Sequence, residues 1–134
     1  MLYAMLAYHD EGHVQSWSED ADADLMADLN AIHARQDAAG QLGPAARLGA
    51  TARAVTVRAG GLVIDGPFTE TKEALLGLYV LDVADLDEAV AEARALQGIN
   101  PSAVYELRPI VVYRPGKAIP LSDFGLADLR PAAT

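Results

Sequence analysis

Two stretches of the chain are short and almost wholly apolar, which is typical of strands buried in a sheet. They span residues 2–8 and 75–83. Gly77 lies inside the second stretch and indicates a bulge or a close approach of another backbone. A further strand is predicted at residues 103–113, where Pro109 favours the edge of a sheet. The apolar runs therefore predict three strands that lie far apart along the chain.

Apolar residues recur with helical spacing between the first two of these strands. A helix is predicted over residues 18–39, with Ser18 as its N-cap and Gly40 as its C-cap. The residues at helical intervals that would form its buried stripe are Leu25, Leu29 and Ile32. The acidic residues that open this helix complement the positive end of its dipole, so they predict a solvated helix start rather than a binding site.

The second predicted helix spans residues 85–98. Asp85 and Glu88 have the spacing of a capping box, with Asp in the place where Ser or Thr is usual. Gly98 would end this helix, and Pro101 prevents it from resuming. The residues expected on its buried face are Leu86, Ala89, Val90, Ala93 and Leu96.

Glycine and proline shape the region between the first helix and the second apolar run. Residues 41–52 are predicted as a loop that leads into a short strand at residues 47–50. The Gly60-Gly61 pair then favours a tight hairpin that joins residues 53–58 to residues 62–64.

The order of these elements predicts an α+β fold of the ferredoxin-like β-α-β-β-α-β kind, in which two helices cover one face of an antiparallel sheet. The uncovered face would carry apolar side chains, so a partner subunit is expected there and the chain is predicted to be a homodimer of the dimeric α+β barrel type. One domain is predicted at residues 1–113. Residues 114–134 are rich in proline and glycine and form either a frayed tail or a docking arm.

Charge and cysteine content exclude several classes of function. The net charge is −9, and the ten basic residues form no cluster, so neither nucleic acid nor an anionic membrane surface is an expected partner. The chain has no cysteine, which excludes disulfides, zinc–thiolate sites and cysteine nucleophiles. No signal peptide or run of about 18 apolar residues is present, and a cytoplasmic protein is expected.

A polar loop at residues 65–73, Asp-Gly-Pro-Phe-Thr-Glu-Thr-Lys-Glu, follows the predicted hairpin. Loops held by a rigid sheet often carry function. Asp65 would either fix the Gly-Pro turn through backbone hydrogen bonds or take part in catalysis. Lys72 is a candidate for binding an anionic ligand, and Glu73 beside it points the opposite way in an extended chain. Tyr79 and Arg108 are further ligand-binding candidates, with cross-strand packing and pairing to Glu106 as the structural alternative.

Two groups of histidines carry the remaining candidate chemistry. His33 and Asp37 are one helical turn apart, so the carboxylate would orient the imidazole of a general base, while a half-buried structural histidine is the alternative. His9 and His13 also have i, i+4 spacing, but residues 9–17 are predicted as a loop. No metal site is therefore predicted, and no cofactor motif is present.

Three segments are similar to the DGPF branch of the YCII-related family: residues 65–73, residues 77–82 together with 85–89, and residues 106–110. The resemblance implies a ferredoxin-like α+β fold that dimerises, in small bacterial proteins often encoded beside extracytoplasmic-function sigma factors. The wider family includes a few degradative enzymes and proteins for which a His–Asp pair on or after the first helix has been proposed as catalytic. Asp37 matches the place of the acid, whereas His33 stands at a different spacing.

Three functions remain open from the sequence. The first is an enzyme that uses acid–base chemistry on a small polar or aromatic molecule in a dimer cleft, with His33, Asp37, Asp65 and Lys72 as the acting groups. The second is a non-catalytic ligand-binding or regulatory module linked to a sigma-factor pathway. The third is a cofactor-free monooxygenase, which rests on analogy of fold alone.

Overall fold

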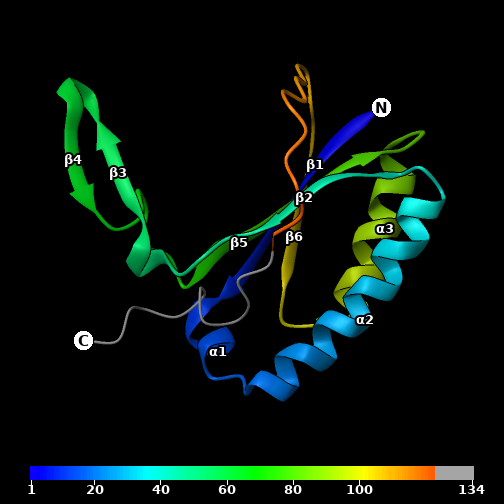
Figure 1. Ribbon diagram of the computed structural model, residues 1–134, viewed down its shortest axis with the longest axis horizontal. Coiled ribbons are helices and arrows are strands. Elements are labelled where there is room, and N and C mark those ends of the chain that lie inside the picture. Colours follow the sequence, from blue (N-terminus) through cyan, green and yellow to red (C-terminus); the bar gives the residue numbers. More distant parts are fainter. Residues whose placement is uncertain (123–134) are drawn as a thin grey trace.

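Four strands form one antiparallel sheet, and two long helices cover one of its faces (Figure 1). The structure is a computed structural model that describes residues 1–122. Two further strands form a hairpin that projects from one end of the sheet. The elements are β1 (Leu2–Asp10), α1 (Glu11–Gln15), α2 (Glu19–Ala38), β2 (Leu42–Arg47), β3 (Val55–Arg58), β4 (Leu62–Asp65), β5 (Glu73–Asp82), α3 (Leu86–Ile99) and β6 (Val104–Pro109), with short 3-10 turns at Thr51–Arg53 and Ala59–Gly61.

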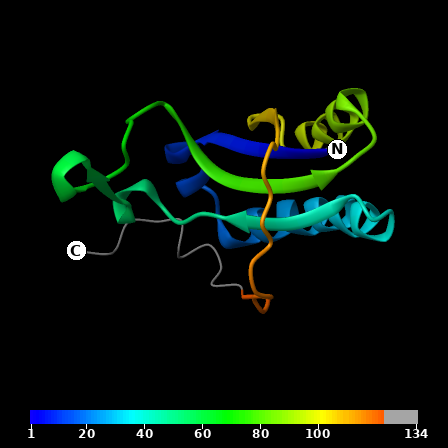
Figure 2. The same ribbon diagram turned by 90° about the horizontal axis from the view of Figure 1, so that it is seen from above.

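The strands of the main sheet are ordered β2-β5-β1-β6, and all three pairings are antiparallel. Figure 2 shows β2, β5 and β1 side by side. Along the chain, the elements of this layer run strand, helix, strand, strand, helix, strand, and the β3–β4 hairpin is inserted between β2 and β5. The α+β class and the antiparallel sheet predicted from the sequence are confirmed.

Capping residues explain where α2 begins and ends. The Ser18 side chain accepts a hydrogen bond from the backbone N–H of Ala21 at 3.0 Å. At the other end, Gly40 has a φ of +71°, its N–H donates to Asp37 O, and the N–H of Gln41 donates to Gln36 O. These two bonds form a Schellman motif, which needs a left-handed residue at the position of Gly40. Both predicted boundaries of this helix are confirmed.

The start of α3 is also as predicted. The Asp85 carboxylate accepts from the N–H of Glu88 at 2.9 Å, and the Glu88 carboxylate accepts from the N–H of Ala84 at 2.8 Å. The side chains therefore satisfy two of the backbone donors around the helix start, as in a capping box. The helix ends at Ile99, one residue beyond the predicted end.

The hydrophobic core lies between the sheet and the helices. Met5 of β1, Leu81 of β5 and Leu96 of α3 are completely buried at its centre. Burial of each such side chain contributes roughly 1.5–3 kcal/mol to folding. The other members of the core cluster are Tyr3, Leu29, Val83, Ala89 and Ala93. The core therefore depends on the two helices and the two central strands, and the hairpin does not contribute to it.

A buried carboxylate links the two helices beneath the surface. Glu92 of α3 accepts hydrogen bonds from the Arg35 guanidinium at 2.9 Å and from the Gln36 amide at 2.7 Å, both on α2. Burial alone would raise the pKa of Glu92, but these two hydrogen bonds and the charge of Arg35 outweigh it, so the pKa is lowered. The charged network fixes α2 against α3.

The second face of the sheet is not covered by the helices. Leu6 is paired with Leu78, and Ala4 with Val80, and these side chains are partly exposed. Glu106 and Arg108 of β6 share this face and form an ion pair with each other. An apolar patch with a polar margin therefore lies on the open face, as the sequence predicted.

Three predicted elements differ from the structure. The second sheet strand lies at Leu42–Arg47 rather than at residues 47–50, because an edge strand with a register shift accommodates Gly43 and Pro44. The last strand ends at Pro109 instead of residue 113. Residues 11–15 form the short helix α1, where a loop was predicted. Within residues 1–122, no helix has both the length and the apolar character needed to cross a bilayer.

Candidate functional site

The polar loop at residues 65–73, the signature loop, turns the chain sharply away from the hairpin at its Gly66-Pro67 step. Gly66 has a φ of +102°, a conformation that side chains with a Cβ rarely adopt. Its N–H donates to Ala54 O at 2.7 Å, and its carbonyl accepts from the Thr56 hydroxyl at 2.8 Å. Asp65 is exposed, and its carboxylate makes no hydrogen bond within residues 1–122. The turn is therefore held by the Thr56 hydroxyl, which donates to a backbone carbonyl, and not by the backbone N–H bonds predicted for the Asp65 carboxylate.

Helix α1 places the acidic residue Glu11 opposite this loop. Asp10 acts as the N-cap of α1 and accepts from the N–H of His13 at 3.2 Å. Glu11, the first residue of the helix, extends toward the 3-10 turn that follows β2. Its carboxylate accepts from the Thr51 N–H at 2.8 Å and from the Thr51 hydroxyl at 2.5 Å. Two hydrogen bonds thus fix this carboxylate between segments 40 residues apart.

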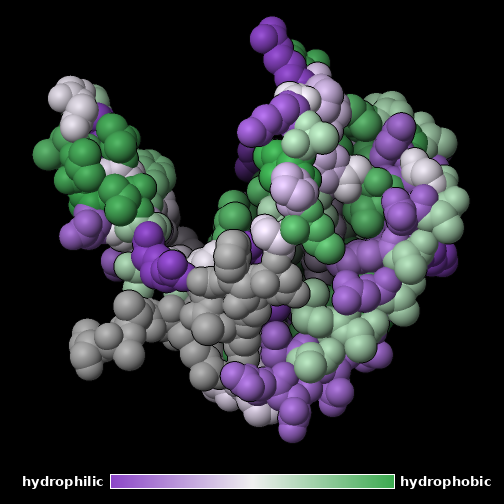
Figure 3. Space-filling model, in the orientation of Figure 1, coloured by the Kyte–Doolittle hydropathy of each residue, from purple (hydrophilic) through white to green (hydrophobic). Residues whose placement is uncertain are grey.

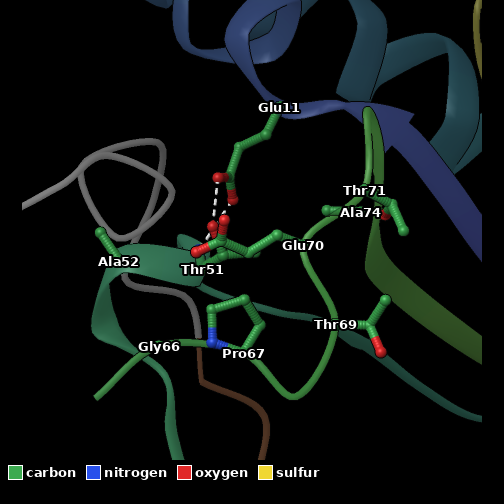
Figure 4. A pocket seen from close by; sticks show the side chains of 9 residues that line it. All are labelled: Glu11, Thr51, Ala52, Gly66, Pro67, Thr69, Glu70, Thr71 and Ala74. Carbon is green, nitrogen blue, oxygen red and sulfur yellow. Dashed lines mark hydrogen bonds between the residues drawn. The ribbon is translucent and has the colours of Figure 1, made fainter.

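A pocket of about 400 Å³ lies between α1, the Thr51 turn and the signature loop. Figure 4 shows the side chains of Glu11, from α1, and Glu70, from the loop, extending toward the same space. The residues that line the pocket are Glu11, Thr51, Ala52, Gly66, Pro67, Thr69, Glu70, Thr71 and Ala74. These nine residues include two carboxylates and three threonine hydroxyls but no basic side chain. The pocket is therefore suited to cations and to ligands that donate hydrogen bonds.

The His9–His13 segment forms an aromatic cluster beside this pocket. The two imidazole rings stack with centroids 5.5 Å apart, and the edge of Trp17 packs against both. His9 is buried, and its Nε2 is 2.8 Å from the hydroxyl of Ser102. His9 lies near the end of β1 and His13 in α1, so the turn from strand to helix brings the two rings together where a loop was predicted. Among residues 1–122, however, no three His, Cys, Asp or Glu side chains gather closely enough to hold a metal ion.

His33 lies on the face of α2 that packs against the sheet. Its ring lies 5.2 Å from the ring of Tyr79, and its buried Nε2 has no hydrogen-bond partner within the described chain. Burial lowers the pKa of His33, which favours the neutral imidazole. Asp37 is exposed, and no hydrogen bond or ion pair joins it to His33 in residues 1–122. The two residues share a helix, but the structure does not bring them together as a hydrogen-bonded pair.

The four predicted ligand-binding residues do not share one cavity. Lys72 and Glu73 are exposed at the start of β5, next to the pocket but outside its lining. Tyr79 is paired with the core residue Met5 and so faces the helices, where burial raises its pKa. Arg108 is paired with Ala4 and lies on the opposite, open face. Tyr79 and Arg108 are thus separated by the sheet, although the predicted pairing of Arg108 with Glu106 is confirmed.

Sequence reasoning missed Glu11 and Thr51 as site residues. Neither belongs to a motif, and they meet only because the chain returns to α1 after β2. The one local signal was the acidic residue directly after a buried strand. Glu70 is one of four ionisable residues in the loop at residues 65–73, and it is the one of the four that lines the pocket.

A family model described as the YCII-related domain matches residues 1–114. The chain belongs to the YCII-related family. Among known proteins, an uncharacterised protein of Rhizobium meliloti is 49% identical over 121 residues, which cover 87% of this chain and 98% of the relative. The family predicted from the signature loop and the flanking strands is confirmed. The matched range ends next to the domain boundary predicted after residue 113.

Proposed function

We propose that this YCII-related protein binds a small cationic or hydrogen-bond-donating molecule in the pocket between Glu11 and Glu70. The observation that carries the proposal is the Glu11 carboxylate, which Thr51 fixes at the pocket wall with two hydrogen bonds. A preorganised carboxylate can bind an ammonium or guanidinium group without first losing side-chain freedom. The volume of about 400 Å³ is within the range of small-molecule sites.

A binding module fits the structure better than the predicted acid–base enzyme built on His33. His33 faces the core, Asp37 faces solvent, and neither lines the pocket. The two carboxylates that line the pocket, Glu11 and Glu70, are placed to meet a ligand. The link to a sigma-factor pathway stays a prediction of the resemblance, and the monooxygenase alternative stays a prediction from analogy of fold.

A thermal-shift screen would test the proposal, because a ligand that binds only the folded chain raises its melting temperature. The screen would compare small amines and guanidines with carboxylic acids and phenols of similar size. We expect amines or guanidines to stabilise the protein and Glu70→Gln to weaken their binding about tenfold, which is the loss of one charge-assisted interaction. Glu19→Gln, at an exposed position on α2, is the matched control. Stabilisation by acids alone, or equal binding by Glu70→Gln, would contradict the proposal.

The proposed quaternary structure is a homodimer in which two ferredoxin-like sheets pack through their open faces. The support is the partly exposed apolar set on that face, Ala4, Leu6, Leu78 and Val80. Substituting Leu78 by Glu would place a charge in this contact, whereas Ala91→Glu changes an exposed position of α3. We expect light scattering to show a dimer for the wild-type chain and the control, and a monomer for Leu78→Glu. A monomeric wild-type chain at micromolar concentration would refute the homodimer.

A further inference from the structure

The β3–β4 hairpin carries apolar side chains on both of its faces. Pairing of Val55 with Asp65 and of Val57 with Val63 places three valines on one face. Leu62 and Ile64 lie on the other face, where Leu62 is paired with Arg58 and Ile64 with Thr56. These five apolar side chains are between 42% and 68% exposed, and Phe68 beyond the hairpin is 72% exposed. Such exposure on both sides of a strand pair is the pattern of a surface that is buried in an assembly.

The hairpin also stands apart from the main sheet. Among residues 1–122, its two strands pair only with each other, so within that range neither outer edge has a strand partner. An isolated two-stranded hairpin is only marginally stable in water without packing against a third element. None of the buried core clusters in residues 1–122 includes a hairpin residue. The hairpin therefore requires a covering surface from outside the sheet-and-helix layer.

A second exposed apolar segment faces the same side of the molecule. Residues 110–122 leave the end of β6, and Val111, Val112, Ile119 and Leu121 within them are between 72% and 98% exposed. In Figure 1 this segment and the hairpin both stand on the side of the sheet opposite the helices. Figure 3 shows a hollow between the hairpin and the rest of the molecule, with hydrophobic surface on both sides of it. A partner that enters this hollow would bury both apolar segments.

We infer that the hairpin is an arm that packs into the corresponding hollow of a second copy of this chain. Each copy carries both the projecting arm and the hollow, so one two-fold axis covers both surfaces in both copies, as an isologous interface requires. The five exposed apolar residues of the arm, together with Phe68 and the exposed residues of the segment after β6, supply apolar surface for an interface, of which a standard one buries ~800 Å² per partner. This inference rests on the homodimer proposed above and deepens it.

Charge is compatible with a second copy of the chain as the partner. The ionisable side chains of the hairpin are Arg58, whose guanidinium lies 5.3 Å from the centre of the Phe68 ring, and Asp65 at the end of β4. The chain as a whole has a net charge of −9, whereas the hairpin carries one charge of each sign. Two copies of this acidic chain can therefore meet at the hairpin without like-charge repulsion from the hairpin itself.

The test compares two double variants by light scattering and by hydrogen exchange. Val57→Glu with Val63→Glu places two charges on the three-valine face, and Ala31→Glu with Ala91→Glu adds the same charges at exposed positions of α2 and α3. We expect the arm variant to raise the dimer dissociation constant at least tenfold while its far-UV circular dichroism stays native. The helix variant should remain as dimeric as the wild type.

Hydrogen exchange of the wild-type chain gives a second result that does not depend on a variant folding. Amides of residues 55–65 should be protected at high protein concentration and lose protection on dilution to the monomer. Protection that does not change with concentration would mean that the chain's own residues cover the arm, and would overturn the inference. So would a dimer unaffected by the arm variant. In that case the sheet-face dimer and the ligand pocket would stand, because Leu78→Glu and the amine screen test them separately.

Discussion

The buried side chains with ionisable groups show how single residues fix the helices on the sheet. Glu92 is charged and accepts from Arg35 and Gln36, whereas His33 is neutral and its Nε2 has no partner among residues 1–122. A charge that is taken out of water must be paired, and a neutral polar atom left unpaired costs less but still destabilises. These two residues therefore predict opposite responses to substitution.

Replacing Glu92 by Gln should destabilise the protein at neutral pH. The substitution removes the negative charge that accepts from Arg35 and Gln36, and loss of such buried bonds costs about 1–3 kcal/mol. The pKa of Glu92 is lowered on folding, so its stabilisation is present above the ordinary value of 4.5 and is lost as pH falls through the lowered value. Urea denaturation at neutral pH and at a pH below 4.5 should show a smaller difference between variant and wild type at the lower pH. Glu73→Gln, at an exposed position, should behave as wild type at both.

Replacing His33 by Phe should leave stability unchanged or raise it by up to about 1 kcal/mol, because an apolar ring removes the unpaired buried nitrogen. Burial lowers the pKa of His33, so the wild-type chain loses stability as pH falls from the ordinary value of 6.5 toward the lowered one. The variant should lack this loss, while His13→Gln should retain it. Denaturation midpoints between pH 7 and about pH 5 would measure both. A strong destabilisation by Phe at neutral pH would show that His33 has a partner it needs.

At the scale of elements, local capping signals predicted the helices well and long-range contacts decided the rest. Ser18, Gly40 and Asp85 act within a few residues, and the sequence alone placed both long helices correctly. The strand β2 was misplaced because its Gly43 and Pro44 are typical of loops, and only pairing with β5 makes this segment a strand. Helix α1 was missed because Gly12 lies inside it. The pocket could not be predicted, since the Glu11–Thr51 contact joins distant segments.

The turn after the hairpin offers a test of backbone conformation with a built-in control. Gly66 has a φ of +102°, so Gly66→Ala should destabilise the protein by about 1–3 kcal/mol through backbone strain alone, since no atom would contact the added Cβ. Gly98 lies in α3 without positive φ and also has open space around it. Gly98→Ala should therefore stabilise by roughly 0.5–1 kcal/mol. Thermal unfolding of both variants would measure these opposite signs, and equal effects would mean that Gly66 tolerates a side chain.

At the scale of the whole molecule, the buried core and the exposed apolar side chains lie in different parts of the chain. Every buried core residue within residues 1–122 lies before Val104, while the hairpin and the segment after Ile110 are largely exposed. The sequence predicted the layer of four strands and two helices, because apolar periodicity reports burial within one chain. It did not predict that the hairpin would stand apart, since its valines are equally consistent with a place in the main sheet. The C-terminal extension at residues 114–134, predicted as a frayed tail or a docking arm, lies partly outside the described residues.

Removing residues 114–134 separates folding from assembly. In the arm variant Val57→Glu with Val63→Glu, which we expect to be monomeric, this truncation should change the free energy of unfolding by less than about 0.5 kcal/mol, as for surface changes generally. In the wild-type background it should weaken the dimer, because the exposed apolar side chains of Ile119 and Leu121 are lost. Denaturation of the monomeric chains and light scattering of the dimeric ones would measure the two effects.

A chain that ends at residue 103 lacks β6 and its pairing with β1, so it should unfold and serves as the destabilised control. A loss above ~1 kcal/mol in the monomeric background would place the extension inside the folded unit, because only residues packed on the core cost that much.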